Sequence, residues 1–435
     1  MRLAMAAPLG LTMMKHASPL RKWLVEYAQQ RRPAGEALRD VISRPGAASG
    51  HREGAGEAEF LPYGPPDDDG RPFCEILATC GGVEAEYAAI RRGAGLLDCP
   101  NRGTLVVTGA QRRDFLNRMV TQDLKDFAPG QVREAFLISR KGRIEADLRL
   151  MEFGGVTLID VDVHQVEAAI RMLEGFLFSE DVEIRDGCET LSHVELHGPQ
   201  ALALIGAATD AGRVELAPGR AASLALGDDA ELFVARIDQT GEPGLVLLTP
   251  RARLIDVWST LVEAADRVDG GARRARPIGW FAYNIARIEA GTPLMNIDFG
   301  SSSLPHETGV LRQRVSFTKG CYPGQEVVAR MEHLGRPKQM LVGLRIQADV
   351  LPVAGAPVYE HTGGDAGAGG PIGEITSSTM SPMLGSAPIA FARLRTTHAD
   401  EGMTVIVSDQ ESRALATVQP LRFLPEAVAA PAPDS

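Results

Sequence analysis

The sequence has few cysteines, few aromatic residues and no long apolar run. Its 435 residues include five cysteines and 5% aromatic residues. No two cysteines form a C-x-x-C pair, so their spacing indicates neither a zinc ribbon nor a disulfide framework. A membrane-spanning helix needs about 20 consecutive apolar residues, and no such run occurs. We therefore expect a cytoplasmic protein in a reducing compartment, with no membrane partner and no metal site.

The chain also lacks a basic charge balance. Its formal net charge is -11 and its pI is about 5.4. Non-specific binding to nucleic acid or to anionic membranes needs a basic surface, so nucleic acid is not an expected partner. The phosphate-loop, nucleophile-elbow and H-E-x-x-H signatures are absent as well. A local basic pocket for an anionic ligand remains compatible with this composition.

The amino-acid composition and the pattern of apolar residues change along the chain and predict four regions. The segment 3–14 is a poor signal peptide, so we expect a leader there, or a start at Met13 or Met14. An amphipathic helix is predicted over 19–31, and a loop or linker over 62–72. The predicted regions are 1–70, leader, helix and linker; 71–339, a core of two interleaved lobes; 340–425, a small β-barrel or sandwich with a flexible loop at 361–370; and 426–435, a disordered tail.

Two stretches of the core resemble each other. VTGAQRRDFL (107–116) and LHGPQALALI (196–205) both read as strand, glycine, any residue, glutamine and apolar helix. Gly109 and Gln111 correspond to Gly198 and Gln200, which predicts two related lobes. Hairpins mixed with helices favour an α+β fold class over a doubly wound sheet.

A hairpin is predicted around the turn Arg140–Gly142. In its second arm apolar and polar residues alternate over 144–150, which places Asp147 on the polar face. His193 and His197 also lie on a predicted strand. Residues four apart on a strand share a face but are too distant to bind one metal ion, so both histidines are interpreted as structural.

Two polar residues outside the hairpin are candidates for ligand binding. Glu242 lies in the turn T-G-E-P-G between two apolar strands. It either meets only water or accepts hydrogen bonds from a ligand such as an amino-pyrimidine edge, since a carboxylate offers two adjacent acceptors. Arg287 comes late in a predicted helix, where it either serves the helix dipole or clamps an anionic group.

The stretch KGCYPGQE (319–326) contains an isolated cysteine between glycines. Cys321 can be a small buried residue before a helix, which is a common position for cysteine. A functional interpretation rests on Lys319, which would favour the thiolate, and on a helix predicted to start in QEVVAR. Gly320 and Gly324 suit a close backbone approach or a positive φ. Cys321 is then a nucleophile or a ligand shared with a partner.

Taken together, these pieces resemble the folate-binding superfamily of the glycine-cleavage T-protein, the aminomethyltransferase. The resemblance covers most of the chain from residue 81 to residue 425. It implies a three-lobed ring, built from two related α+β lobes and a C-terminal β-barrel, with tetrahydrofolate in a central channel. The stretches that carry it are EYAAIRRGAGLLDCPNRG, KGRIEADLRL, ELHGPQA, QTGEPGLVL, ARIEAGTPL and GPIGEITSSTMSPMLGSAPIAFARL.

One branch of this superfamily is marked by K-G-C-[YF]-x-G-Q-E, and the chain carries that pattern intact. Members of the branch are folate-binding proteins that support iron–sulfur cluster assembly or repair, and one is described as tRNA-modifying. The aminomethyltransferases have paired aspartates in the hairpin, whereas here the pair is Ala146 and Asp147. The residues that match the branch are Lys319, Gly320, Cys321, Tyr322, Gly324, Gln325 and Glu326.

The resemblance leads to three functional hypotheses. The first is a tetrahydrofolate-binding protein that supports iron–sulfur enzymes or their assembly proteins, with folate on Glu242 and Arg287 and with Cys321 near the channel. The alternative is a one-carbon transferase for aminomethyl or methyl groups, in which Asp147 orients the folate nitrogen and stabilises positive charge. The third is a folate-storing protein without chemistry. Cys321 discriminates, because only the first hypothesis needs its thiol.

Overall fold

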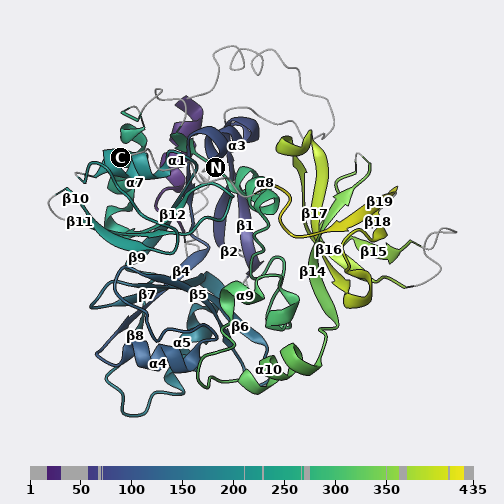
Figure 1. Ribbon diagram of the computed structural model, residues 1–435. Helices are drawn as coiled ribbons and strands as arrows, with labels where there is room; N and C mark the ends of the chain where they lie inside the picture. Colours follow the sequence, from purple (N-terminus) through teal and green to yellow (C-terminus); the bar gives the residue numbers. More distant parts are fainter. Residues whose placement is uncertain are drawn as a thin grey trace, which may run out of the picture.

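The computed structural model shows two α+β lobes and a β-barrel (Figure 1), so the predicted fold class is confirmed. The expected leader and tail and most of the loop at 361–370 lie outside the described residues, as do residues 67–69 and 71 of the expected linker. The structure describes residues 17–30, 57–66, 70, 72–209, 211–227, 230–265, 267–268, 275–348, 350–361, 370–409 and 412–425.

The first lobe contains a five-stranded antiparallel sheet with the strand order β5-β6-β7-β4-β8. Ala146 and Leu148 of β6 are fully buried, and they pack with Leu105 of β4 and Phe115 of α4. This burial follows the alternation predicted from the sequence. The elements are β4 (Arg102–Thr108), α4 (Arg112–Met119), β5 (Val132–Ile138), β6 (Ile144–Glu152), β7 (Thr157–Asp162), η1 (Val163–Gln165), α5 (Val166–Glu174) and β8 (Glu183–Asp186).

The second lobe contains a six-stranded sheet with the order β10-β11-β12-β9-β3-β13. Strand β3 precedes the whole first lobe in the chain, so the chain starts this sheet, builds the other lobe and then returns. Its core packs Leu96, Val194 and Leu245 against Trp258. The elements are α3 (Val83–Arg92), β3 (Ala94–Asp98), β9 (Leu191–His197), α6 (Ala201–Ala208), β10 (Ala221–Leu226), β11 (Ala230–Arg236), β12 (Gly244–Pro250), η2 (Arg251–Arg253), α7 (Leu254–Ala264), β13 (Ala275–Pro277) and α8 (Trp280–Ala290).

The internal repeat seen in the sequence forms the same strand-to-helix connection in both lobes. Gly109 directly follows β4 with φ 99°, and Gly198 directly follows β9 with φ 137°. A Cβ atom at Gly109 would lie 2.1 Å from a backbone oxygen, and one at Gly198 would lie 2.3 Å from another. Only glycine fits at either position. Gln111 and Gln200 then occupy the N-cap positions of α4 and α6.

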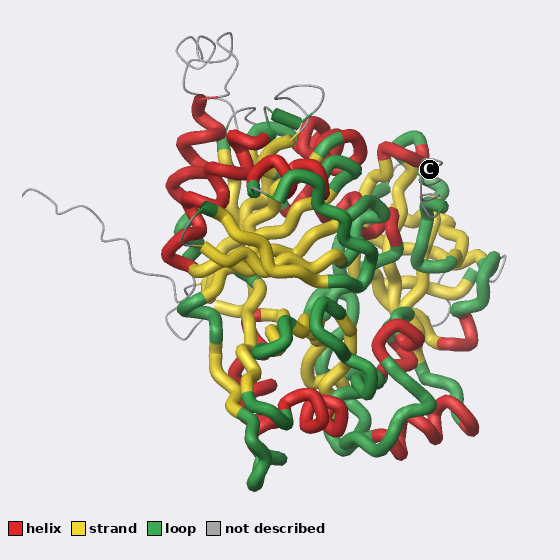
Figure 2. Tube along the Cα trace, turned by 60° about the vertical axis from the view of Figure 1, so that its left-hand side comes forward, coloured by secondary structure: helices red, strands yellow, loops and turns green. Residues whose placement is uncertain are grey.

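The third lobe is a closed six-stranded barrel with the order β14-β17-β16-β15-β18-β19. In Figure 2 its strands are separate from those of the two sheets, and loop segments run between them. Leu344, Val358, Ile375 and Leu394 are buried inside it. The connecting helices and the barrel elements are η3 (Pro305–Glu307), α9 (Leu311–Arg314), α10 (Gln325–Leu334), β14 (Gln339–Ile346), β15 (Pro357–Glu360), β16 (Gly373–Ser381), η4 (Pro382–Leu384), β17 (Ala387–Arg395), η5 (Thr396–His398), β18 (Thr404–Asp409) and β19 (Ser412–Gln419).

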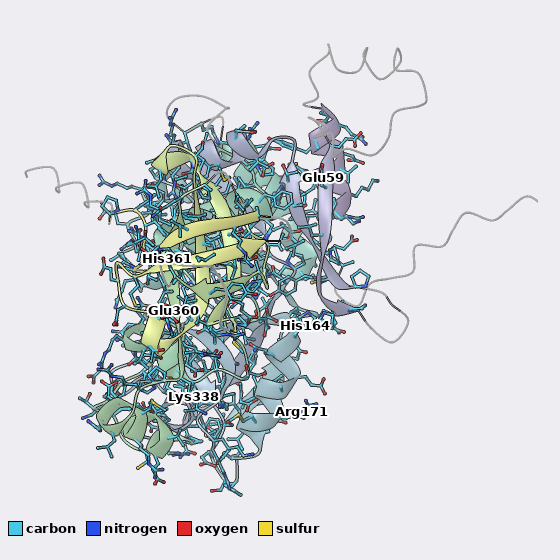
Figure 3. The ribbon with its side chains drawn as sticks, turned by 90° about the vertical axis from the view of Figure 1, so that its right-hand side faces the viewer. Glu59, His164, Arg171, Lys338, Glu360 and His361 are labelled. Atoms are coloured by element: carbon cyan, nitrogen blue, oxygen red, sulfur yellow. The ribbon has the colours of Figure 1, made fainter. Side chains whose placement is uncertain are left out.

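The N-terminal elements correct one prediction. The sequence predicts a linker over 62–72, but β1 (Ala58–Pro66) pairs with β2 (Pro72–Cys80) in an antiparallel hairpin. Irregular register around Tyr63 accommodates the prolines, so tertiary pairing overrides their local preference. The Tyr63 hydroxyl donates to Asp162, and the centroids of the Tyr63 and His164 rings are 5.7 Å apart. Figure 3 shows His164 near one end of the hairpin. The predicted first helix is present as α1 (Arg21–Gln30).

Among the residues that the structure describes, none of the helices is both long enough and apolar enough to span a membrane.

Candidate functional site

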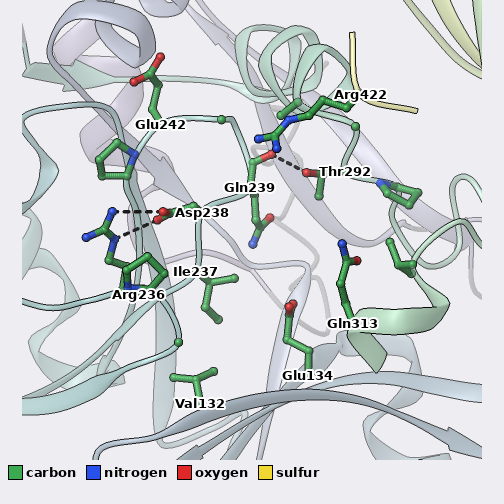
Figure 4. Close-up of a pocket in the computed structure, with 18 of the residues that line it drawn as sticks. Val132, Glu134, Arg236, Ile237, Asp238, Gln239, Glu242, Thr292, Gln313 and Arg422 are labelled. Carbon is green, nitrogen blue, oxygen red and sulfur yellow. Dashed lines mark hydrogen bonds and ion pairs between the residues drawn. The ribbon is translucent and has the colours of Figure 1, made fainter. Parts of the chain in front are cut away.

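A cleft of about 1270 Å³ lies where the parts of the fold meet. Its walls come from β5, from the turn between β11 and β12, and from the C-terminal end of α8 (Figure 4). Helix α9 and the segment that follows the barrel complete it. The lining residues that matter most are Glu134, Gln239, Glu242, Thr292, Arg314 and Arg422.

Glu242 stands on the predicted turn, where Gly241 has a φ of 83°. One carboxylate oxygen lies 3.4 Å from Nη1 of Arg91, and the side chain is 22% exposed. Burial raises the pKa of the Glu242 carboxyl, while Arg91 opposes that rise. Arg91 is itself held by Glu289 at 2.5 Å. The carboxylate is therefore fixed at the wall of the cleft and can accept hydrogen bonds from a ligand.

Gln239 is a cleft residue that sequence reasoning missed. The residue is 3% exposed, and its Nε2 has no hydrogen-bond partner among the described residues. Its Oε1 accepts from the Tyr283 hydroxyl, and its backbone oxygen accepts from Thr292 Oγ1 at 2.7 Å. Figure 4 shows the amide pointing into the cleft, toward the side of Glu134. A buried donor without a partner is costly, so this amide is suited to an acceptor atom of a ligand.

Asp147 lies next to a buried arginine, Arg314, which lines the cleft. Nε of Arg314 lies 2.8 Å from Oδ1 of Asp147, and Nη1 of Arg314 lies 2.8 Å from Oε2 of Glu134. The neighbouring Ala146 is fully buried in the core, on the other face of β6. Burial alone would lower the pKa of Arg314, but the two carboxylates raise it by more. The net change is a rise, so the guanidinium stays charged. The arginine thus fixes both carboxylates in position.

A second cavity, of about 50 Å³, is lined by Asp147. We call it the inner cavity. Gln239 lines both the cleft and the inner cavity, while Arg314 lines the cleft and Asp147 the inner cavity. The two spaces therefore meet at these three side chains. Other residues that line the inner cavity are Tyr63, Asp98, Arg102, Arg149, Asp162, Glu195, Trp280, Tyr283 and Leu294.

A buried charge network supports the inner cavity. Asp160 pairs with Arg102 at 2.7 Å and with Arg149 at 3.0 Å. Burial would raise the pKa of Asp160, but the two guanidiniums lower it to about 2. His193 belongs to the same network, and burial lowers its pKa to about 4. His197 bonds to Glu195 at 2.9 Å. Among the described residues no His, Cys, Asp and Glu group of three or more is arranged to hold a metal ion.

Comparisons with known proteins place this geometry in a family. The model described as the GCVT N-terminal domain matches residues 72–319, and the glycine cleavage T-protein C-terminal barrel domain matches residues 339–424. The chain belongs to the glycine cleavage T-protein family. Most of the cleft and the inner cavity are therefore built from residues that the family models cover.

Individual relatives agree with this family. The aminomethyltransferase of Streptomyces coelicolor is 30% identical over 335 residues, which are 74% of this chain and 84% of that protein. The aminomethyltransferase of Chlorobaculum tepidum is 28% identical over 346 residues, 79% and 90% of the two chains. The fold is similar to that of the glycine cleavage system aminomethyltransferase T from Bartonella henselae, with a TM-score of 0.71, 23% identity and coverage of 85% and 95%.

The K-G-C stretch of this T-protein family member forms a surface turn ahead of α10. Cys321 is exposed and does not line the cleft. Lys319 points inward, where its Nζ donates to the backbone oxygens of Asn117, Val120 and Gln122 at 2.5–2.8 Å. Burial lowers the pKa of Lys319 to about 8. The expected direct assistance of Lys319 to the thiol is not supported, because its hydrogen bonds are made elsewhere.

The remaining residues of the stretch form its scaffold. Tyr322 is buried beside Ile144 and Val328. Gly324 has a φ of 78° and caps α10, and a Cβ there would lie 2.3 Å from the oxygen of Ser139, so glycine is required. A Cβ at Gly320 would meet no atom of the described residues within 4 Å. Helix α10 begins at Gln325, as predicted, and Glu326 is exposed on its first turn.

Arg287 lies behind the cleft rather than in it. Its side chain is fully buried, and its Nη1 pairs with Asp298 at 2.6 Å. Nη2 donates to Ser377 of the barrel at 2.6 Å, and Nε donates to Asn284. The expectation that Arg287 clamps an anionic ligand is not supported by this geometry, because the guanidinium already joins α8 to the barrel.

Proposed function

We propose that this chain is a tetrahydrofolate-dependent one-carbon transferase. The observation that carries the proposal is the meeting of the cleft and the inner cavity at Asp147, in a chain related to aminomethyltransferases. A transferase must bring an acceptor and a donor together at one polar group. A cleft for the acceptor and a smaller space behind it for the donor meet that requirement.

The cleft suits tetrahydrofolate in size and in polar groups. Ligand sites commonly measure about 300–1,000 Å³, and this cleft is at least as large. Glu242 supplies acceptors for the N–H groups of a pterin edge, and the unpartnered Nε2 of Gln239 supplies a donor for a ring acceptor. Arg133, Arg236 and Arg422 line the same cleft, where guanidiniums suit the carboxylates of a glutamyl tail.

Bound tetrahydrofolate would supply the ring nitrogen that accepts the one-carbon unit. The protein's part is electrostatic. The Asp147 carboxylate stabilises positive charge near that nitrogen and holds the proton that leaves it. Arg314 keeps the carboxylate in one orientation, since it bonds only Oδ1. The absence of a second aspartate at Ala146 leaves Asp147 as the acid–base group of the hairpin.

The test separates binding from transfer. Calorimetry with tetrahydrofolate should show binding to the native protein and nearly the same affinity for Asp147→Asn, which keeps the shape of the side chain. One-carbon transfer, followed by mass spectrometry of the folate pool, should be lost in Asp147→Asn. A protein that binds no tetrahydrofolate would refute the proposal, and so would an Asp147→Asn variant with native turnover.

A second candidate function rests on the intact K-G-C stretch. The exposure of Cys321 favours a role in contact with another protein, as expected for folate-binding support of iron–sulfur assembly or repair. In that case Cys321→Ser would bind tetrahydrofolate normally but fail to maintain iron–sulfur enzymes in cells that lack the native gene. Full maintenance by Cys321→Ser would exclude this candidate and leave the transferase.

A further inference from the structure

The inner cavity has the composition of a site for a small organic cation. Its lining includes the carboxylates of Asp98, Asp147, Asp162 and Glu195 but only two guanidiniums. Both guanidiniums pair with Asp160, which lies outside the lining, and Arg149 also pairs with Glu195 at 3.2 Å. Arg314, also outside the lining, pairs with Asp147. Even with Asp160 and Arg314 included, the carboxylates outnumber the guanidiniums around the cavity, which favours a cationic occupant.

Aromatic side chains provide the second feature of such a site. Trp280, Tyr283 and Tyr63 all line the inner cavity, and the rings of Trp280 and Tyr283 are 5.8 Å apart. The faces of tryptophan and tyrosine attract ammonium groups, most strongly where water is excluded. Carboxylates and aromatic faces in one enclosed space are typical of sites for alkylated ammonium ions.

Gln239 separates the inner cavity from the cleft, because it lines both spaces. Nε2 of Gln239 is buried, and within the described part of the chain it has no hydrogen-bond partner. The amide faces the junction with the cleft, so it marks the boundary between the two compartments. The carboxylates and aromatic rings on the opposite wall of the inner cavity are then available to a second ligand, distinct from the one in the cleft.

The size and closure of the cavity limit what can enter it. A single water needs about 10–15 Å³ of such space, so 50 Å³ accommodates about three to five groups of that size. Tyr63 closes part of the wall and bonds to Asp162. It belongs to β1, which precedes the segment that the family models match. A donor attached to a carrier protein by a long arm would have to displace that hairpin to enter the inner cavity from this side.

We propose that the inner cavity binds a small methylated ammonium ion, free in solution, as the methyl donor. The inference rests on the proposed function, because it places this donor opposite tetrahydrofolate across Asp147. The methyl–nitrogen bond of the ammonium breaks, and its electron pair stays on the departing amine. The methyl carbon bonds to the ring nitrogen of tetrahydrofolate, and the proton of that nitrogen passes by way of Asp147 to the amine. No oxidant or reductant is required.

Calorimetry on the full chain with tetramethylammonium tests the inference directly. tert-Butanol is the control probe, since it has a similar size and no charge. We expect tetramethylammonium to bind and tert-butanol to fail to displace it. Trp280→Leu removes an aromatic face and should weaken tetramethylammonium binding by about tenfold. Equal binding of the two probes, or native affinity in Trp280→Leu, would overturn the inference.

A pair of substitutions at Leu294 locates the site. Leu294 lines the inner cavity and is absent from the cleft lining. Leu294→Phe should fill the space and abolish tetramethylammonium binding, while the similar-sized Leu294→Met should retain it. Thermal melting confirms that both variants fold. Tetramethylammonium binding that survives Leu294→Phe in the folded protein would place the ion elsewhere and refute the site.

Tetrahydrofolate titrations of the same proteins distinguish the two proposals. Tetrahydrofolate affinity should be unchanged in folded Leu294→Phe. Tetrahydrofolate binding without any tetramethylammonium binding would refute the donor site alone. Absence of tetrahydrofolate binding in the native protein would refute the proposed function, and with it the assignment of the ion as a donor.

Discussion

Arg314 and Asp147 are 167 positions apart in the sequence, yet Nε of the arginine lies 2.8 Å from Oδ1 of the aspartate. The pair joins α9 to β6 at the point where the cleft and the inner cavity meet. The pair therefore contributes to stability and to the proposed function. The guanidinium neutralises the carboxylates of Asp147 and Glu134, and it holds the Asp147 carboxylate in position for the proposed transfer.

Removing this arginine should destabilise the fold strongly. Breaking a buried ion pair leaves an uncompensated charge, so Arg314→Met should lower the free energy of unfolding by about 3 kcal/mol or more. Arg312 on the same helix is the matched control, since its side chain is 70% exposed and pairs with Glu332 at the surface. Arg312→Met should cost less than about 1 kcal/mol. Urea unfolding of both variants measures the difference, and equal losses would contradict the prediction.

Glu242→Gln should weaken tetrahydrofolate binding. The substitution keeps the shape but replaces an acceptor by an N–H₂ group, which would face the N–H groups of the pterin. A mismatched polar contact costs about 1–3 kcal/mol, or about ten- to a hundredfold in affinity. Glu326→Gln is the control, because that side chain is exposed on α10. Unchanged affinity in Glu242→Gln, measured by calorimetry, would remove the residue from the site.

Asp98 should give the protein an unusual dependence of stability on pH. Burial raises the pKa of Asp98 to about 6, although Ser18 Oγ donates to it at 2.5 Å. The folded protein then binds the proton more tightly than the unfolded chain, whose pKa is about 3.9. The contribution of Asp98 is fully present below about pH 4 and is lost as the pH rises through about 6, by about 3 kcal/mol in total.

The measurement compares unfolding free energies of the native protein and Asp98→Asn between pH 4 and 7. His193 acts in the opposite direction, because its pKa is lowered to about 4 and its contribution grows as the pH rises. The native curve alone therefore mixes the two effects, whereas the difference between the curves isolates Asp98. A difference that stays flat across this range would show that the carboxyl titrates normally.

Cys321 should be the first cysteine to react with iodoacetamide. It is exposed, whereas Cys74, Cys99 and Cys188 are buried and Cys80 is intermediate. Burial raises the pKa of Cys74 and of Cys188 to about 12, which suppresses their thiolates. Mass spectrometry of the native protein should find one fast adduct, at Cys321, and none in Cys321→Ser. Fast labelling of any other cysteine would mean that the fold opens around it.

Local patterns in the sequence were enough to predict much of the fold. The strand–glycine–x–glutamine–helix repeat predicted two related lobes, because Gly109 and Gly198 meet the same backbone requirement in each. The alternation around Asp147 predicted its strand and face, and Gly324 marked the start of α10. Each of these features depends on a few neighbouring residues, so a single sequence contains the whole signal.

Only the tertiary structure decided the partners of the charged residues. Arg287 could equally clamp a ligand in a sequence-based interpretation, but Asp298 and the distant Ser377 enclose it. Gln239 carries no motif, and its unpartnered amide becomes visible only when the cleft is formed. Tyr63 lies in a stretch that reads as linker, yet it closes the inner cavity. The energy of a buried polar group depends on atoms brought together from far along the chain, so these roles are absent from local sequence and arise on folding.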